Sequence, residues 1–356
     1  MSKTRVWFNA LHSKAGGGLT YLFNMAPQLA ADPRLDVTVI ATPEQAVPEG
    51  VARLSPPEWA RRRGFMAAEQ IWLPWAARRH GVDVVYSPAN YGPLWGVALV
   101  ILLSNSIAVG RLEKRWSKRL YWLAVAMATW ASLKRSSMAI AVSAAIRDEL
   151  AGRNGDGVVV IPHGVSSRFS PADIPRQDFV LAVGDIYIQK NFHSLIDAFA
   201  ILRRAHPNYR LKIAGTVIDQ DYKSKLESQI LRLGLGEAVE FLGRRSVDEI
   251  KELYRTCRVF AFPSLAESFG MPILEAMACG APVVASDRSA MPEVAGGAGI
   301  LVDAADPGRL AEALAAVLER PELGREMAEA GIRHAARFTW DAAAARTAEV
   351  LISTRD

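Results

Sequence analysis

The stretch FPSLAESFGMPILEAMACG, residues 262–280, decides the fold class. It continues the apolar run Val259–Phe262, turns at Ser268–Gly270 and then has the composition of a helix, with Pro272 at its first position. Proline is favoured there because the first helical N–H has no partner within the helix. A short apolar strand, a glycine turn and a helix in direct succession are the repeating unit of an α/β protein with a parallel sheet.

The same stretch predicts a binding site for an anion flanked by two acids. The helix would present unpaired N–H groups and its positive dipole end near Gly270–Ile273, where a diphosphate is stabilised. Glu267 and Glu275 lie on either side of the turn, and a carboxylate is a good acceptor for two vicinal hydroxyls. A nucleotide sugar carries a diol at each end and a diphosphate in the middle. The alternative makes Glu275 a solvated first-turn acid and Glu267 an ordinary loop charge.

Strand–helix alternation extends over the chain in two series. The first series of short apolar runs comprises residues 5–10, 37–40, 82–86, 97–103, 138–142 and 158–161. The second comprises residues 179–183, 211–214, 239–242, 259–262, 282–285 and 299–302. Continuous apolar strands separated by helices indicate parallel sheets with both faces covered. The predicted fold is therefore α/β, with two Rossmann-like doubly wound domains facing a cleft, where ligands bind beyond the carboxyl ends of the strands.

Length and composition agree with a two-domain enzyme. The chain has 356 residues, of which 50% are hydrophobic and 22% charged, and these values exclude a disordered or collagen-like chain. The two cysteines, Cys257 and Cys279, have no zinc or CxxC spacing. Neither a secretory leader nor a run of about 18 apolar residues is present, so we expect a cytoplasmic protein.

At these motifs the chain resembles the retaining glycosyltransferases of family 4, which have the GT-B architecture. The resemblance covers almost the whole chain, and its most specific part is the E-x7-E pattern of Glu267 and Glu275, followed by residues 280–286 and 292–294. It implies that Glu267 contacts the donor sugar and Glu275 the ribose hydroxyls. It also implies a donor-binding turn whose backbone holds the diphosphate, formed by Ser268, Phe269, Gly270 and Met271.

A second motif that matches the family is VGDIYIQKN, residues 183–191. The resemblance assigns Gly184 to donor binding and Lys190 to stabilising the departing diphosphate, since charge on the leaving group is the main electrostatic problem of sugar transfer. Family members usually have an arginine directly after the glycine, whereas this chain has Asp185. The alternative is that Lys190 is a surface lysine at a helix start.

Gly16–Gly18 lies between the first strand and the first helix, where the missing Cβ atoms allow the backbone to approach a ligand. The tripeptide is not GxGxxG, so a dinucleotide site is weakly supported, and a flexible turn is the alternative. The family resemblance, in which this loop faces the donor phosphates, favours Gly17 and Gly18 as donor-binding residues.

Many family members have a His–Asp pair after the strand at residues 100–103, but this chain continues Ser104–Asn105–Ser106. Asn105 can bind a sugar hydroxyl but is no general base at neutral pH. The family mechanism lets the departing phosphate oxygen take the acceptor proton, so we list Asn105 with Lys190 and Glu267 as catalytic candidates. A strand-end turn is the alternative for Asn105. His163 is interpreted as a hinge or packing residue, with catalysis as the lesser alternative.

No cofactor and no metal site is predicted. Asp219 and Asp221 superficially match the DxD pattern that holds a metal in the other large glycosyltransferase fold. A helical pattern follows them directly, so one of the two is expected to be a helix N-cap. GT-B enzymes generally need no metal.

The first half of the chain is strongly basic. Residues 1–170 contain 20 Lys and Arg against 11 Asp and Glu, a net charge of +9, while the remaining residues carry −4. Basic and aromatic residues precede an apolar run within residues 114–127, a combination that suits a helix on an anionic membrane. The alternative is an ordinary domain helix. Nucleic acid is not expected, because no nucleic-acid-binding motif accompanies the charge.

Together these observations predict an acceptor-side domain over residues 1–165, a donor-binding domain over 166–338, and a helix over 339–356 that packs on the first domain. The expected activity is metal-independent, retaining transfer of a sugar from a nucleotide diphosphate to a glycan or lipid-linked glycan, as in polysaccharide or O-antigen synthesis. The protein is expected in the cytoplasm, associated peripherally with the inner face of the membrane. A sugar-nucleotide epimerase and a non-catalytic binding subunit are the rivals, and donor base, sugar and linkage cannot be read.

Overall fold

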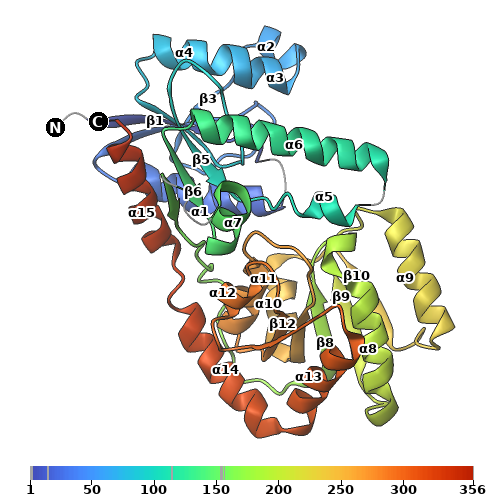
Figure 1. The fold of residues 1–356 in the computed structure, drawn as a ribbon. Coiled ribbons are helices and arrows are strands. Elements are labelled where there is room, and N and C mark those ends of the chain that lie inside the picture. Colours follow the sequence, from blue (N-terminus) through green and yellow to red (C-terminus); the bar gives the residue numbers. More distant parts are fainter. Residues whose placement is uncertain (1–2, 14–15, 114, 153–154, 156, 356) are drawn as a thin grey trace. The chain divides into compact units, whose positions relative to one another are not determined.

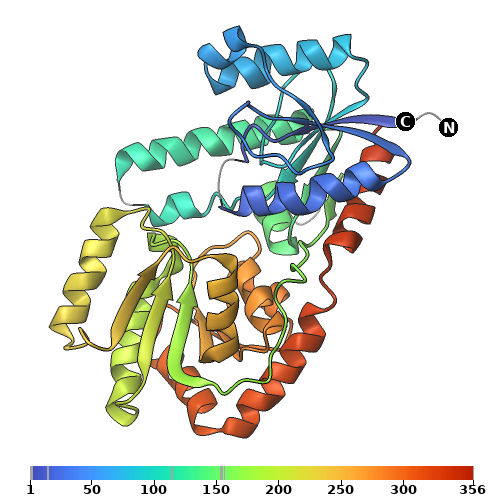
Figure 2. The ribbon, with the colours of Figure 1, turned by 180° about the vertical axis from the view of Figure 1, so that it is seen from behind.

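The computed structural model describes residues 3–13, 16–113, 115–152, 155 and 157–355. The chain divides into two compact units. The first unit comprises residues 1–110, 115–164 and 339–356, and the second comprises residues 111–114 and 165–338. Each contains one parallel sheet covered by helices (Figures 1 and 2), so the prediction of two doubly wound α/β sheets is confirmed.

The sheet of the first unit has the strand order β3-β2-β1-β4-β5-β6-β7. Its strands are β1 (Thr4–Asn9), β2 (Leu35–Ile40), β3 (Ala52–Leu54), β4 (Val84–Ser87), β5 (Ala98–Leu103), β6 (Met138–Ala141) and β7 (Val158–Val160). Every pair is parallel. The sequence analysis missed β3, because this edge strand is three residues long and largely exposed, with no apolar run to mark it.

The helices of the first unit are α1 (Gly16–Ala31), α2 (Glu58–Arg62), α3 (Phe65–Ala67), the π-helical turn η1 (Ala68–Trp72), α4 (Leu73–Arg79), α6 (Trp116–Arg135), α7 (Ala144–Ala151) and α15 (Trp340–Ser353). The short helix α5 (Val109–Leu112) begins in the first unit and ends in the second. Our placement of Gly16–Gly18 in a loop is wrong, because α1 begins at Gly16 and its first turn contains all three glycines.

Helix α15 contributes to the first unit although it follows the second unit in sequence. The Arg34 guanidinium, just beyond α1, lies 2.7 Å from the Glu349 carboxylate of α15. Arg346 of α15 donates a hydrogen bond of 2.7 Å to the carbonyl of Val160. The Trp340 ring packs edge-on against Tyr21 of α1, with centroids 5.8 Å apart. The last helix therefore helps to bury α1.

The sheet of the second unit has the order β10-β9-β8-β11-β12-β13. Its strands are β8 (Gln177–Val183), β9 (Arg210–Ala214), β10 (Val239–Gly243), β11 (Cys257–Phe262), β12 (Val283–Ser286) and β13 (Ile300–Val302). All six strands predicted for this half are present. Its helices are η2 (Ile188–Lys190, a 3-10 turn), α8 (Phe192–Ala205), α9 (Gln220–Arg232), α10 (Val247–Thr256), α11 (Met271–Ala278), α12 (Met291–Ala295), α13 (Pro307–Glu319) and α14 (Pro321–Ala335).

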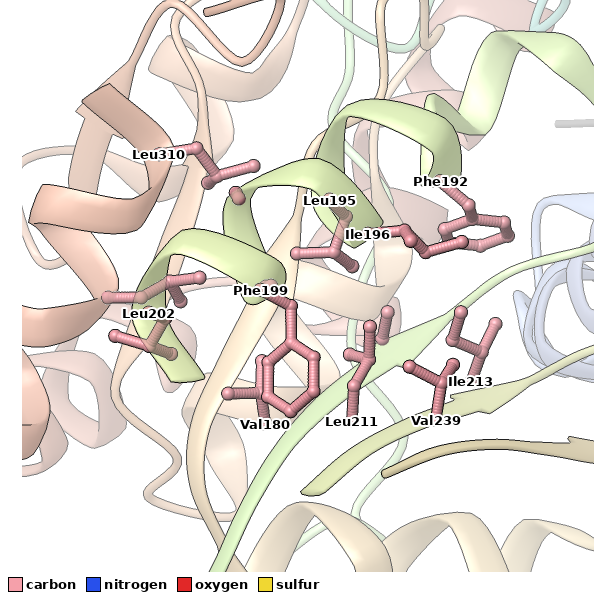
Figure 3. Close-up of a cluster of buried hydrophobic side chains, with 14 of the residues drawn as sticks. Val180, Phe192, Leu195, Ile196, Phe199, Leu202, Leu211, Ile213, Val239 and Leu310 are labelled. Atoms are coloured by element: carbon pink, nitrogen blue, oxygen red, sulfur yellow. The ribbon is translucent and has the colours of Figure 1, made fainter. Parts of the chain in front are cut away.

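The core of the second unit explains why α8 lies on the sheet. Phe192, Leu195 and Phe199 recur at helical spacing and are fully or almost fully buried against strand residues such as Val180 and Leu211 (Figure 3). Each buried side chain of this size contributes about 1.5–3 kcal/mol. The packing fixes the start of α8, and with it the loop between β8 and α8.

Candidate functional site

The sheet order of the second unit selects one place for a ligand. From β8 the chain proceeds outward through β9 and β10, and then returns to β11 on the other side of β8. The loops after β8 and β11 therefore diverge at the carboxyl edge, and this switch point is where open α/β sheets bind ligands. Those two loops contain the sequence-predicted Lys190 and Glu267.

Lys190 and Glu267 form an ion pair. The Lys190 Nζ lies 2.6 Å from Glu267 Oε1, and the two side chains are 14% and 12% exposed. The same ammonium lies 5.1 Å from the centre of the Phe262 ring, which adds a cation–π contact. A surface lysine is therefore the wrong interpretation, because this cation is held against a carboxylate and a ring at the switch point.

Asn191 fixes this arrangement, although the sequence analysis gave it no role beyond being the last residue of the motif at 183–191. Its backbone is left-handed, with φ 56°, a conformation that asparagine tolerates better than most residues. Its buried side-chain amide donates to the carbonyls of Pro263 and Ala304, at 3.1 and 2.7 Å. The turn that carries Lys190 is thus tied to the ends of β11 and β13.

Gly184 leaves space for the lysine. A Cβ at this position would lie 3.0 Å from Cε of Lys190, which is tighter than an ordinary contact. Directly after it, Asp185 is exposed and accepts a hydrogen bond of 3.1 Å from the backbone N–H of Thr216. The residue that replaces the family's usual arginine therefore binds the loop after β9 and supplies no positive charge.

The predicted helix terminus lies on the other side of Glu267. Gly270 is the N-cap of α11 with φ 102° and has no side chain to cap the helix. Pro272 has no N–H, and the Ile273 N–H donates to the Gly270 carbonyl at 2.9 Å. The Met271 N–H is thus the group of the first helical turn that suits an anion. The helix begins at Met271, so Pro272 is its second residue and not its first. Phe269 is buried, which leaves the backbone of Ser268–Met271 as the part of the turn suited to binding.

The main chain of Glu267 is held in place as well, by Ser289. Its N–H donates to Ser289 Oγ at 3.2 Å, and that hydroxyl donates back to the Glu267 carbonyl at 2.6 Å. Ser289 follows β12 and has φ 54°. The sequence analysis did not identify this residue, because nothing in the sequence marks its pairing with a loop 22 residues away.

Glu275 is partly buried within α11 and accepts a hydrogen bond of 3.2 Å from the Tyr254 hydroxyl. Burial raises the pKa of the Glu275 carboxyl to about 7, although the bond from Tyr254 acts in the opposite direction. Glu275 is therefore not the fully solvated acid of the alternative interpretation.

Gly17, Gly18 and Asn105 belong to the first unit, whereas the other predicted site residues belong to the second. Asn105 is exposed, and its backbone is held by the buried Asn90: the Asn105 N–H donates to Asn90 Oδ1 at 2.9 Å, and Asn90 Nδ2 donates to the Asn105 carbonyl at 2.7 Å. Asn90, which the sequence analysis missed, therefore positions the loop after β5.

A polar network at the first unit's own switch point, between β1 and β4, was also missed. Glu69 is fully buried, and its Oε1 lies 2.6 Å from Nε2 of His12 and accepts a bond of 2.8 Å from Nδ2 of Asn9. The His12 ring contacts Tyr91 edge-on, with centroids 4.7 Å apart. These residues are scattered over 80 positions of sequence, so no local motif announces them.

Other candidate residues have structural roles. Asp219 caps α9 by accepting the N–H of Tyr222 at 3.2 Å, as predicted for one acid of the DxD. Among the described residues, no three His, Cys, Asp or Glu side chains cluster in a way that could hold a metal ion. His163 packs between Tyr21 and Trp340, and burial lowers its pKa to about 3. It is an uncharged side chain packed between two aromatic rings, which agrees with the packing interpretation.

Two family models match this chain. The model described as Glycosyltransferase Family 4 matches residues 15–169, and the model described as Glycosyl transferases group 1 matches residues 166–334. A D-inositol 3-phosphate glycosyltransferase from Segniliparus rotundus is 33% identical over 199 residues, which is 52% of this chain and 44% of that protein. The chain spans about half the length of the curated relatives that it matches.

Solved structures share the fold over nearly the whole chain. Sucrose-phosphate synthase from Thermosynechococcus elongatus superposes with a TM-score of 0.80 at 20% identity, covering 99% of both chains. The Anabaena protein HepE in complex with UDP gives a TM-score of 0.78 at 22% identity, covering 99% of this chain and all of that one. At such identities the likeness concerns the fold.

Proposed function

The chain belongs to the group 1 and family 4 glycosyltransferases with the GT-B fold, and from that premise we propose that it transfers a sugar, with retention, from a nucleotide diphosphate to a hydroxyl of a glycan or lipid-linked glycan. The observation that carries the proposal is the Lys190–Glu267 pair beside the open N-terminus of α11. A cation, a helix end and two acids lie within one switch point.

Each residue has a definite task in this proposal. The diphosphate binds the N–H groups at Gly270 and Met271, and Lys190 exchanges its bond to Glu267 for one to the phosphate. The released Glu267 carboxylate accepts hydrogen bonds from the sugar. Glu275 accepts the ribose hydroxyls. No metal is required, because Lys190 and the helix end supply the positive charge that the departing diphosphate needs.

Retention requires the acceptor to bond to the face of the sugar from which the phosphate departs, and the acceptor proton must also be accepted. The bond between the sugar and the phosphate oxygen breaks, the acceptor oxygen bonds to the same face of the sugar, and the departing phosphate oxygen takes the acceptor proton. No protein base is then needed, which agrees with Asn105 at the place where many relatives have histidine. Asn105 and the Gly17–Gly18 backbone are proposed to position substrate without transferring protons.

The comparisons support a nucleotide-sugar donor. A protein of the same fold, HepE, is described in complex with UDP, and a curated relative is a glycosyltransferase that acts on an inositol phosphate. Donor class is therefore tested first by thermal shift against UDP, GDP, dTDP and ADP, since a ligand that prefers the native state raises its stability. If none of the four raises the melting temperature, the proposal is wrong.

An acceptor-dependent assay separates the rivals. A transferase consumes the donor faster when an acceptor is present, whereas an epimerase processes it at the same rate without one. A binding subunit consumes no donor in either case. Only the first result supports the proposal.

We also propose that the first unit lies at an anionic membrane surface. No described helix is long and apolar enough to cross a bilayer, but α6 exposes large apolar side chains on its outer side, and Trp116 is 78% exposed. The members of this outer stripe are Trp116, Leu120, Leu123, Met127 and Trp130. Apolar residues beside a basic helix start suit the interface of an anionic bilayer. Flotation with liposomes tests this: equal binding to neutral and anionic vesicles would contradict it.

A further inference from the structure

The first unit contains an apolar pocket of about 560 Å³ that the proposed chemistry does not use. Its walls come from α3 and η1, from the loop at residues 91–95, and from one face of α6. The lining residues on α6 share a helical face distinct from the outer stripe: Tyr121, Ala124, Val125, Ala128 and Ser132. The volume lies in the range of about 300–1,000 Å³ typical of ligand sites.

The pocket wall is held in place by hydrogen bonds. Pro74 has no N–H to give to the carbonyl of Gln70 four residues earlier, and Trp95 Nε1 donates to this carbonyl at 2.7 Å instead. The Gln70 amide donates to the Gly92 carbonyl at 3.0 Å and accepts the Leu94 N–H at 3.1 Å. The loop is therefore fixed to the helix by three bonds, and the pocket is preformed.

The same bonds leave an apolar interior. Ser132 Oγ accepts the Gly92 N–H at 3.3 Å, so the hydroxyl on the α6 wall is engaged. Glu69 also lines the pocket, but it is fully buried and its carboxylate is bonded to His12 and Asn9. A peptide entering this pocket would need partners for its own N–H and carbonyl groups. A hydrocarbon chain needs none.

The surroundings favour an anionic lipid over a second copy of the chain. The Arg79 guanidinium of α4 lies 5.6 Å from the centre of the exposed Trp75 ring, and the Arg63 guanidinium, directly after α2, lies 5.9 Å from that of the exposed Trp59 ring. Arg119 is also exposed on α6, on the side of the helix that carries the outer stripe. Two copies meeting here would oppose like charges, whereas a lipid with an anionic head complements them.

We propose that this pocket, between η1 and α6, holds one hydrocarbon chain of the lipid carrier of the acceptor. The proposal rests on the proposed transfer to a lipid-linked acceptor, and it narrows that acceptor to an anionic lipid whose chain leaves the bilayer to enter the protein. Helix η1 is a π-helical turn, a form that is frequent at functional sites.

The test uses octyl, decyl and dodecyl phosphate below their micelle concentrations, with calorimetry as the readout. Each buried methylene contributes a constant increment, so affinity should rise by up to about fifteenfold for each added pair of methylenes. Ala128→Phe places a ring in the pocket and should abolish this dependence on chain length. Ala124→Phe, on the exposed part of the same wall, guards against a folding defect in the first variant.

Ala131→Phe is the matched control. Ala131 is exposed on the same helix and is not among the residues that line the pocket, so this variant should keep the dependence on chain length. Equal dependence in all four proteins would assign the chains to the outer stripe of α6 and overturn the proposal. So would an absence of chain-length dependence in the unchanged protein, or a dimer that Ala128→Phe dissociates.

A second measurement separates this proposal from the proposed function. The nucleotide-induced rise in melting temperature reports on the second unit and should be the same in Ala128→Phe and in the unchanged protein. If the protein binds a nucleotide but no alkyl phosphate, the proposed lipid-chain site is wrong and the proposed transferase activity is unaffected. Alkyl phosphate binding without any nucleotide binding refutes the transferase, and the pocket then remains a lipid site without an assigned reaction.

Discussion

The two units share the order of their first six strands, to which the sheet of the first unit adds a seventh, but they place different chemistry at their switch points. In the second unit the loops after β8 and β11 bring together Lys190 and Glu267, an ion pair with 14% and 12% exposure. In the first unit the corresponding region between β1 and β4 contains the fully buried Glu69 with His12, next to an apolar pocket. One topology thus supports a partly buried ion pair in one unit and an apolar pocket in the other.

The ligands that we propose for the two units would account for the difference. A diphosphate needs donors and positive charge that are present before it binds, and in our proposal Lys190, paired with Glu267 in the absence of ligand, supplies that charge. A hydrocarbon chain needs only a space without unpaired polar groups, and around the pocket of the first unit the side chains of Glu69 and Ser132 are bonded within the protein. The predictions below test this contrast.

The largest effect is expected for Lys190→Ala. Removing one preorganised positive group at the leaving group should lower kcat about 10²- to 10³-fold, with a smaller effect on donor affinity. Steady-state kinetics with the nucleotide sugar found by the ligand screen measures this. Lys225→Ala removes an exposed lysine from α9 of the same unit and should leave kcat unchanged. Full activity of Lys190→Ala would remove the lysine from the mechanism.

Asn191→Ala comes next, because the turn that positions Lys190 depends on it. The substitution leaves the carbonyls of Pro263 and Ala304 without their donor and puts alanine at φ 56°. We expect the free energy of unfolding to fall by about 2–4 kcal/mol, since each unsatisfied buried group costs about 1–3 kcal/mol. Urea denaturation measures this, and Asn105→Ala, at an exposed asparagine, should change it by less than about 0.5 kcal/mol. An equal loss of unfolding free energy in the two variants would mean that Asn191 does not hold the turn that carries Lys190.

The second unit was far easier to predict from sequence than the first. Its strands are continuous apolar runs, and Lys190, Glu267 and Gly270 lie in loops directly after β8 and β11, so topology alone brings them together. Asn191 and Ser289 act through bonds to distant loops, and no local pattern marks such partners. For the first unit, the sequence predicted Gly17, Gly18 and Asn105 but not the Glu69 network, because burial of a glutamate depends on tertiary packing. The assignment of functional roles to all these residues remains a prediction.

A smaller effect concerns pH and Glu275. Its pKa is raised to about 7 by burial, so the carboxyl is largely protonated at pH 6 and ionised at pH 8. Because only the carboxylate accepts bonds from both ribose hydroxyls, affinity for a nucleotide sugar should rise about tenfold between these two values. Calorimetry should show proton release on binding near pH 7.

Glu275→Gln is the control for that titration, since it cannot ionise and should bind with weak, pH-independent affinity. Ionisation of Glu275 with rising pH should affect stability in the opposite direction from nucleotide-sugar binding. Ionising a buried acid opposes folding, so the contribution of Glu275 to stability is full below its unfolded pKa and is lost as pH rises through about 7. A nucleotide-sugar affinity that is flat from pH 6 to 8 in the unchanged protein would show that Glu275 does not bind the ribose.

The smallest effect should come from Trp95→Phe in the first unit, and it tests whether the apolar pocket is preformed. The indole N–H compensates for the donor that Pro74 lacks, through its bond of 2.7 Å to the Gln70 carbonyl. Loss of this bond should cost about 1 kcal/mol of unfolding free energy, measured in urea, while Trp116→Phe at a highly exposed site should cost almost nothing. Because the loop would then be less fixed before the ligand enters, dodecyl phosphate should bind more weakly to Trp95→Phe even though the apolar lining is kept. An unchanged affinity for dodecyl phosphate would mean that the pocket wall forms only around the ligand. The first unit would then have no preformed apolar site to contrast with the ion pair of the second unit.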